Sequence, residues 1–211
     1  MENLTLLEMA KAIFANNKQK GFWENPRSVA DCADLVISEL SEALEAERAN
    51  KFTRGRNEEL LYNPYLFQEE IKDTLEDELA DAFIRMLDLF GAVVEHCTRH
   101  EIPQPEICET LSEYEQTYKE PAANGSRPQS SARLKAVKRI AEMGMTCQKF
   151  TIGGEPNYYN YYGFAPQWRL AMISLVEVWL SYGYDFESLQ WHIDAKVSYN
   201  KSRPAKHGKA F

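Results

Sequence analysis

Hydrophobic residues recur along most of the chain at the three- and four-residue spacing of amphipathic α-helices. No stretch shows the convincing alternation of apolar and polar residues that a half-buried β-strand needs. The pattern predicts an all-α protein, a helical bundle that folds as a single domain over residues 1–211. Helices are expected at residues 4–19, 28–50, 69–96, 106–118, 132–149, 168–182 and 187–201.

Glycine, proline and asparagine mark the connections between these segments. Residues 21–26 interrupt the first helix, and residues 51–68 are predicted to be an irregular connection. Residues 120–131 are predicted to be a loop. Asp185 or Ser188 is expected to cap the last helix, because both side chains can accept a hydrogen bond from a helical N–H group.

Composition narrows the class of protein. A net charge of −8 argues against binding to a nucleic-acid polymer, whose phosphates attract basic surfaces. The start of the chain has no basic segment followed by an apolar run, and no stretch reaches the length of a membrane span. None of the four cysteines forms a C-x-x-C pair. We therefore expect a cytoplasmic protein with reduced thiols and no contact with a membrane.

Two pairs of carboxylates stand out on neighbouring predicted helices. Glu39 and Glu42 lie three residues apart on one helix, and Glu78 and Asp81 repeat this spacing on the next. Each pair therefore shares a helix face. Glu39 and Glu78 fall inside the apolar arcs of their helices, so they are predicted to face the seam between them. Glu42 and Asp81 are expected to lie beside them.

Carboxylates in a packed seam are unfavourable unless a positive charge compensates them. Mg²⁺ is a common solution, with Mn²⁺ as a possible substitute, because hard cations prefer oxygen ligands. The alternative is that the acids lie at the margin of the seam and pair with Arg48, Arg85 or Lys72. A di-iron site is not indicated, since it requires Glu-x-x-His pairs that these motifs lack.

The C-terminal segment is basic. Lys196, Asn200 and Arg203 recur at helical spacing and can share one face, where an ammonium, an amide and a guanidinium suit phosphate oxygens. Lys206, in the tail that follows, is a weaker candidate. The alternative is a solvated helix end, where cations are favourable in any case.

These residues resemble the MazG-like all-α nucleoside triphosphate pyrophosphohydrolases, which are related to the dimeric dUTPases. The family carries E-x-x-E on one helix and E-x-x-D on the next, and often a lysine, an asparagine and an arginine near the C-terminus. The resemblance covers about residues 5–97 and 180–211. It rests on the segments GFW, ISELSEALEAER, LEDELADAFIRMLDL and RPAKHGKAF.

The resemblance implies Mg²⁺-dependent hydrolysis of a nucleoside or deoxynucleoside triphosphate to the monophosphate and pyrophosphate. The four carboxylates would hold the metal, and Glu39 or Glu42 would also accept a proton from the attacking water. A homodimer or homotetramer is implied as well. The residues expected to bind the substrate are Lys196, Asn200, Arg203, Lys206 and Trp23.

Two features depart from the family pattern. The segment between the two carboxylate motifs is longer than in compact members, and residues about 100–168 are predicted to be an insertion. That insertion has three possible roles, as a lid, an oligomer contact or a base-recognition element. A non-catalytic helical module that binds nucleotides or another protein remains the alternative function.

Overall fold

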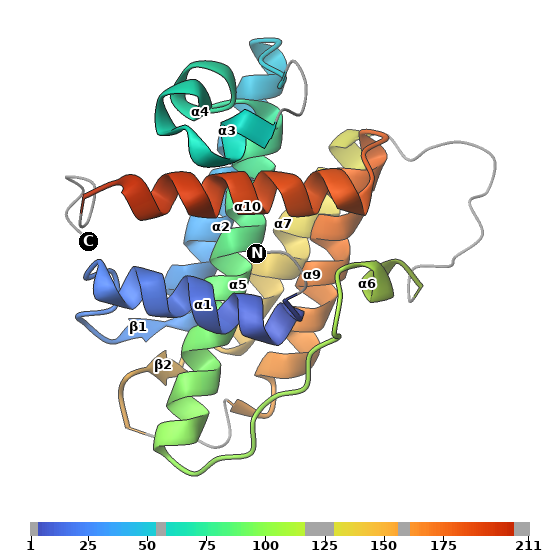
Figure 1. Ribbon diagram of the computed structural model, residues 1–211. Helices are drawn as coiled ribbons and strands as arrows, with labels where there is room; N and C mark the ends of the chain where they lie inside the picture. Colours follow the sequence, from blue (N-terminus) through green and yellow to red (C-terminus); the bar gives the residue numbers. More distant parts are fainter. Residues whose placement is uncertain (1–3, 54–57, 117–128, 156–160, 205–211) are drawn as a thin grey trace.

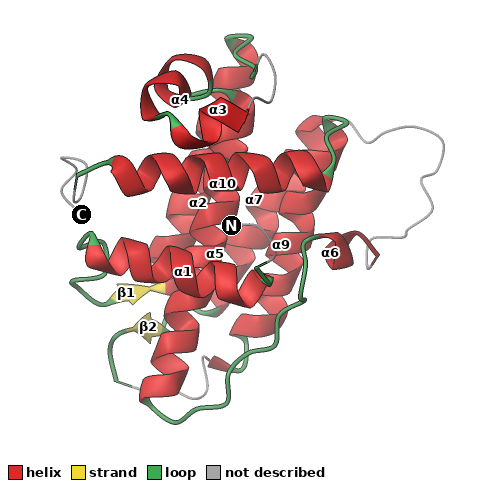
Figure 2. Ribbon diagram, viewed as in Figure 1, coloured by secondary structure: helices red, strands yellow, loops and turns green. Residues whose placement is uncertain are grey.

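The computed structural model describes residues 4–53, 58–116, 129–155 and 161–204, and within them the chain is almost entirely helical (Figures 1 and 2). The prediction of an all-α protein is confirmed. The long helices are α1 (Leu6–Gln19), α2 (Val29–Arg48), α5 (Leu75–Arg99), α7 (Gln129–Thr146), α9 (Phe164–Ser181) and α10 (Phe186–Ser202). The short elements are α3 (Glu58–Tyr62), α4 (Pro64–Glu70), α6 (Ser112–Gln116), β1 (Arg27–Ser28) and β2 (Thr151–Ile152).

Two helix pairs form the core. Helix α2 packs along α5, α7 packs along α9, and the two pairs meet through the contact of α2 with α7. Helices α1 and α10 both run across α5 (Figure 1). Large apolar side chains fill the interior, among them the fully buried Trp168, Trp179, Phe83 and Phe90. None of the helices in the described part of the chain combines the length and apolarity needed to cross a bilayer.

Side-chain caps fix where the carboxylate-bearing helices begin. Ser28 accepts a hydrogen bond from the Asp31 N–H in a capping box at the start of α2. Thr74 caps α5, because its side chain accepts a hydrogen bond from the Asp77 N–H. Asp185 caps α10, which confirms one of the two predicted caps. Because the start of a helix sets its phase, the first two caps determine which way the two acidic motifs point.

The predicted helix over 69–96 is wrong at its start. Helix α4 ends at Glu70, and α5 begins only at Leu75. Asp73 between them has a positive φ of 62°, which no continuous helix allows. The prediction of an irregular connection over 51–68 is also wrong, because α3 and most of α4 lie there. The Asn63-Pro64 pair starts a helix, with Asn63 as its cap and the proline in its first turn.

The predicted insertion, residues 100–168, contains α6, α7, β2 and the first residues of α9. Helix α7 belongs to the core, since it buries Ala132, Ala136, Ile140 and Met143. Strand β2 pairs with β1 in antiparallel register, with Arg27 opposite Ile152. Strands of two residues are too short to show an alternating pattern, which is why the sequence did not predict them.

Candidate functional site

A cleft of about 220 Å³ lies where α2, α5 and α10 meet the end of α1. It gathers acidic residues from α2 and α5 and basic residues from α10 and from the segment after α1. Most of the residues predicted to act on a substrate therefore share one concave surface. The lining consists of Asn17, Lys20, Phe22, Glu39, Glu42, Lys72, Asp73, Glu78, Asp81, Ile84, Arg85, Lys196, Asn200 and Arg203.

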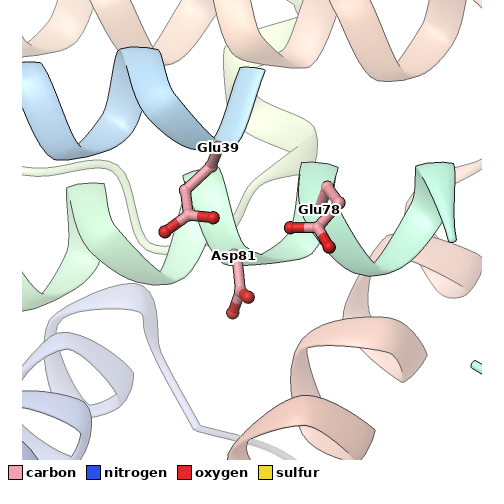
Figure 3. Close-up of side chains that lie close together, drawn as sticks. All are labelled: Glu39, Glu78 and Asp81. Carbon is pink, nitrogen blue, oxygen red and sulfur yellow. The ribbon is translucent and has the colours of Figure 1, made fainter. Parts of the chain in front are cut away.

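Three carboxylates converge in this cleft. Glu39 on α2 and Glu78 and Asp81 on α5 each offer one oxygen, and these oxygens all lie within 4.8 Å of one another (Figure 3). Glu39 and Glu78 are buried, as their positions in the apolar arcs predict, while Asp81 is partly exposed. Three oxygens this close can act as ligands of a single divalent cation. We call these three residues the carboxylate trio.

Glu42, the fourth predicted metal ligand, is not part of the trio. It lies on the exposed side of α2 and lines the rim of the cleft, where its Oε1 accepts a hydrogen bond of 3.2 Å from Ser38. Asp81 follows Glu78 at the same spacing and does converge, so the spacing does not explain the position of Glu42, which depends on how α2 and α5 approach each other. Three of the four predicted metal ligands thus converge, and Glu42 as a fourth ligand stays a prediction.

Burial and mutual repulsion disfavour the charged forms of these acids. Burial, followed by the neighbouring charge of Asp81, raises the pKa of Glu39 to about 7, against the opposing effect of Arg85. Burial, followed by the charges of Asp77 and Asp81, raises the pKa of Glu78 to about 9. A cation placed among the three oxygens would relieve this repulsion, so the site favours a positive ligand.

The predicted alternative, pairing of the acids with basic side chains, is observed for Glu39. The Arg85 Nε donates a hydrogen bond of 3.0 Å to its Oε1. Lys72 lies instead against its neighbour Asp73 at the edge of the cleft. Glu39 therefore has a cationic partner in Arg85.

Lys196, predicted to bind phosphate, is held by two carboxylates. Its Nζ donates to Asp77 Oδ1 at 2.8 Å and Oδ2 at 2.7 Å, and lies 2.7 Å from Asp81 Oδ2. Burial lowers the pKa of Lys196, but the charges of Asp81 and Asp77 outweigh it and raise that pKa above its usual value. Asp77 was not among the predicted site residues, although its spacing of four residues from Asp81 places both on one helix face.

Asn200 and Arg203 continue the basic surface of α10 into the cleft. Lys20, at the end of α1, donates to the main-chain carbonyls of Lys201 at 3.1 Å and Arg203 at 2.7 Å, and also contacts that of Asn200. The Arg203 guanidinium lies 5.5 Å from the centre of the Tyr199 ring. The end of α10 is thus anchored, and its polar side chains lie in the same cleft as the trio.

Trp23, predicted to bind the substrate, does not line this cleft. Its Nε1 donates to the buried Asp88, at 3.1 Å to Oδ1, and its ring packs edge-on against Phe14. The preceding residue, Phe22, is the aromatic side chain that reaches the cleft. A loop pattern does not reveal which of two adjacent aromatic residues faces inward. Lys206, the last predicted substrate-binding residue, lies outside the described residues.

Comparison with protein-family models, curated proteins and solved structures finds no match to this chain. The function must therefore be argued from the geometry of the cleft. Carboxylates that can hold a hard cation lie beside an amide, a guanidinium and ammonium groups. Such a surface suits a metal-bound chain of phosphates, whose oxygens can bind both the metal and the basic groups.

Proposed function

We propose that this protein is a Mg²⁺-dependent pyrophosphohydrolase that converts a nucleoside or deoxynucleoside triphosphate to the monophosphate and pyrophosphate. One observation carries the proposal: the carboxylate trio shares a cleft with Lys196, Asn200 and Arg203. The resemblance of both acidic motifs to the MazG-like family supplies the class of substrate and the bond that is cut.

The trio fits Mg²⁺ in donor type. Its ligands are all carboxylate oxygens, from Glu39, Glu78 and Asp81, and burial together with the neighbouring carboxylates raises the pKa values of Glu39 and Glu78. When bound, Mg²⁺ would neutralise phosphate charge and orient the attacking water. Mn²⁺ has similar ligand preferences and is expected to replace it.

The remaining cleft residues take part in binding and proton transfer. Arg203 and Asn200 would bind phosphate oxygens, the guanidinium by paired hydrogen bonds and the amide by a neutral one. Water adds to the α-phosphorus and pyrophosphate leaves, so the water must lose a proton. Of the two predicted acceptors, Glu39 belongs to the trio, whereas Glu42 lies at the open rim of the cleft. We assign the proton to Glu42.

Phe22 is the aromatic residue best placed to contact a base or sugar, because it lines the cleft in place of Trp23. Assembly into a homodimer or homotetramer remains part of the proposal. Helix α7 already packs against α2 within one chain, so such contacts would use other surfaces. Light scattering on the purified protein tests this point.

The alternative is a non-catalytic helical module that binds nucleotides or another protein. It is favoured by the ion pairs of the cleft, since Arg85 compensates Glu39 and Lys196 compensates Asp81 without a metal. Under this alternative the same acids would serve only to hold α2, α5 and α10 together.

The test supplies the purified protein with Mg²⁺ and each common ribonucleoside and deoxyribonucleoside triphosphate. We expect pyrophosphate and the matching monophosphate from at least one of them, with loss of both on chelation. Glu39→Gln should remove this activity, and Asp34→Asn, on the exposed face of the same helix, should retain it. Stabilisation by Mg²⁺ and nucleotide without turnover would support the alternative instead.

A further inference from the structure

The ammonium group of Lys196 is shared between two carboxylates that differ in surroundings. It makes two contacts with Asp77, at 2.8 and 2.7 Å, and one with Asp81, at 2.7 Å. Both the lysine and Asp77 are buried, whereas the Asp81 side chain is 18% exposed. Asp81 lines the cleft together with the lysine.

Asp77 is held in place by the turn before α5. The Asp73 N–H donates to its Oδ2 at 3.1 Å, and its own N–H donates to the Thr74 hydroxyl at 3.3 Å. The positive φ of Asp73 directs the first of these N–H groups towards the helix. Asp77 thus has a fixed position, while Asp81 lies at the surface of the cleft.

Asp81 has two potential cationic partners. It belongs to the trio, and it also accepts the Lys196 ammonium. A divalent cation at the trio and an ammonium on the same carboxylate would repel each other strongly at such short range. Occupation of the trio is therefore expected to weaken the contact of Lys196 with Asp81, while its two contacts with Asp77 remain available.

Building on the proposed function, we propose that Asp77 is a positioning residue that retains Lys196 when Asp81 binds the divalent cation. In the metal-free protein Lys196 partly compensates the charge of Asp81. When the metal is bound, Asp77 keeps the ammonium at the wall of the cleft, where it can face a phosphate oxygen. Without Asp77, Lys196 would pair with Asp81 alone and compete with the metal for it.

The test measures Mn²⁺ affinity without nucleotide, by the electron paramagnetic resonance signal of free Mn²⁺, in four proteins: wild type, Asp77→Asn, Lys196→Met and the double variant. Asp77→Asn should weaken Mn²⁺ binding about tenfold, and Lys196→Met should strengthen it. In the double variant the loss caused by Asp77→Asn should largely disappear, because no ammonium is left to compete. If Asp77→Asn changes Mn²⁺ affinity equally with and without Lys196, Asp77 acts on the metal only through its own negative charge. That result would overturn the proposal.

Glu76→Gln is the matched control. It neutralises the buried acid next to Asp77, whose carboxylate is bound by the Thr53 N–H at 2.9 Å and the Tyr184 hydroxyl at 2.6 Å. Its effect on Mn²⁺ affinity should be the same whether or not Lys196 is present. If Asp77→Asn does not fold, Lys196→Met decides alone, since unchanged or weaker Mn²⁺ binding would overturn the proposal. If the wild type binds no Mn²⁺, the proposed metal site is overturned as well. If the effects of Asp77→Asn and Lys196→Met on Mn²⁺ affinity simply add, only the role of Asp77 is overturned.

Discussion

The two helix pairs of the core bury acidic residues in different ways. On the α7–α9 pair, the buried Glu177 is bound by Lys135 at 2.7 Å. On the α2–α5 pair, several acids lie together in one cleft and share the cations Arg85 and Lys196. One acid matched to one cation is typical of a structural ion pair. Converging carboxylates, two of them with raised pKa values, are typical of a site that takes up a positive ligand.

The largest effect is expected from substitutions of the carboxylates on the α2–α5 pair. Glu39→Gln or Asp81→Asn should lower kcat/KM for triphosphate hydrolysis by about a hundredfold or more, because each replaces a charged carboxylate of the proposed metal site by a neutral amide. Circular dichroism should show an intact helical fold. Unchanged activity in both variants would remove the trio from the site.

The matching change on the α7–α9 side should affect stability only. Glu177→Gln removes the charged partner of Lys135 and should lower the free energy of unfolding by about 1–3 kcal/mol, measured by urea denaturation. The kcat and KM of the folded protein should stay at the wild-type values. A loss of Mg²⁺-dependent activity would show that the two pairs are not functionally distinct.

A smaller effect is expected at the basic surface. Arg203→Ala should raise KM about tenfold and change kcat little, because it removes charged hydrogen bonds to the phosphates. Lys201→Ala is a suitable control, since this exposed lysine of the same helix end does not line the cleft. Equal KM values for wild type and Arg203→Ala would exclude the guanidinium from substrate binding.

The smallest effect is expected in the pH dependence of stability, which further distinguishes the acids of the α2–α5 pair from Glu177. In the folded protein burial and neighbouring carboxylates raise the pKa values of Glu39 and Glu78 to about 7 and about 9, from an ordinary value of 4.5. Between pH 4.5 and each raised pKa, the folded state holds a proton that the unfolded state has lost. These two acids therefore make the free energy of unfolding fall as the pH rises. Calorimetry should show a flatter pH dependence for Glu78→Gln. Mg²⁺ should also flatten the wild-type profile, because metal binding requires the deprotonated acids. A Glu78→Gln profile as steep as the wild-type one would contradict the raised pKa.

The long helices were predictable because their apolar spacing persists over several turns. The burial of Glu39 and Glu78 followed from the same periodicity. The Asn63-Pro64 pair was misread as part of a loop, since the same residues mark both turns and helix starts. The packing of α7 against α2 was not predictable, because periodicity identifies an apolar face but not the distant segment that covers it.

The site was predictable only in outline. Asp77 was overlooked within an acidic run, since spacing alone does not show which acid meets a lysine more than a hundred residues away. The exposure of Glu42 depends on how closely α2 and α5 approach each other. The exchange of Trp23 for Phe22 depends on the path of the loop after α1, for which no periodic rule exists.

The most direct test of the central claim is to follow the wild-type protein, Mg²⁺ and its best triphosphate by phosphorus-31 nuclear magnetic resonance. The account predicts monophosphate and pyrophosphate in equal amounts, and no reaction after Mg²⁺ is chelated. Diphosphate with inorganic phosphate would place the cut at the γ-phosphate and contradict the proposed reaction. Equal product formation by Glu39→Gln would contradict the assignment of the carboxylate trio.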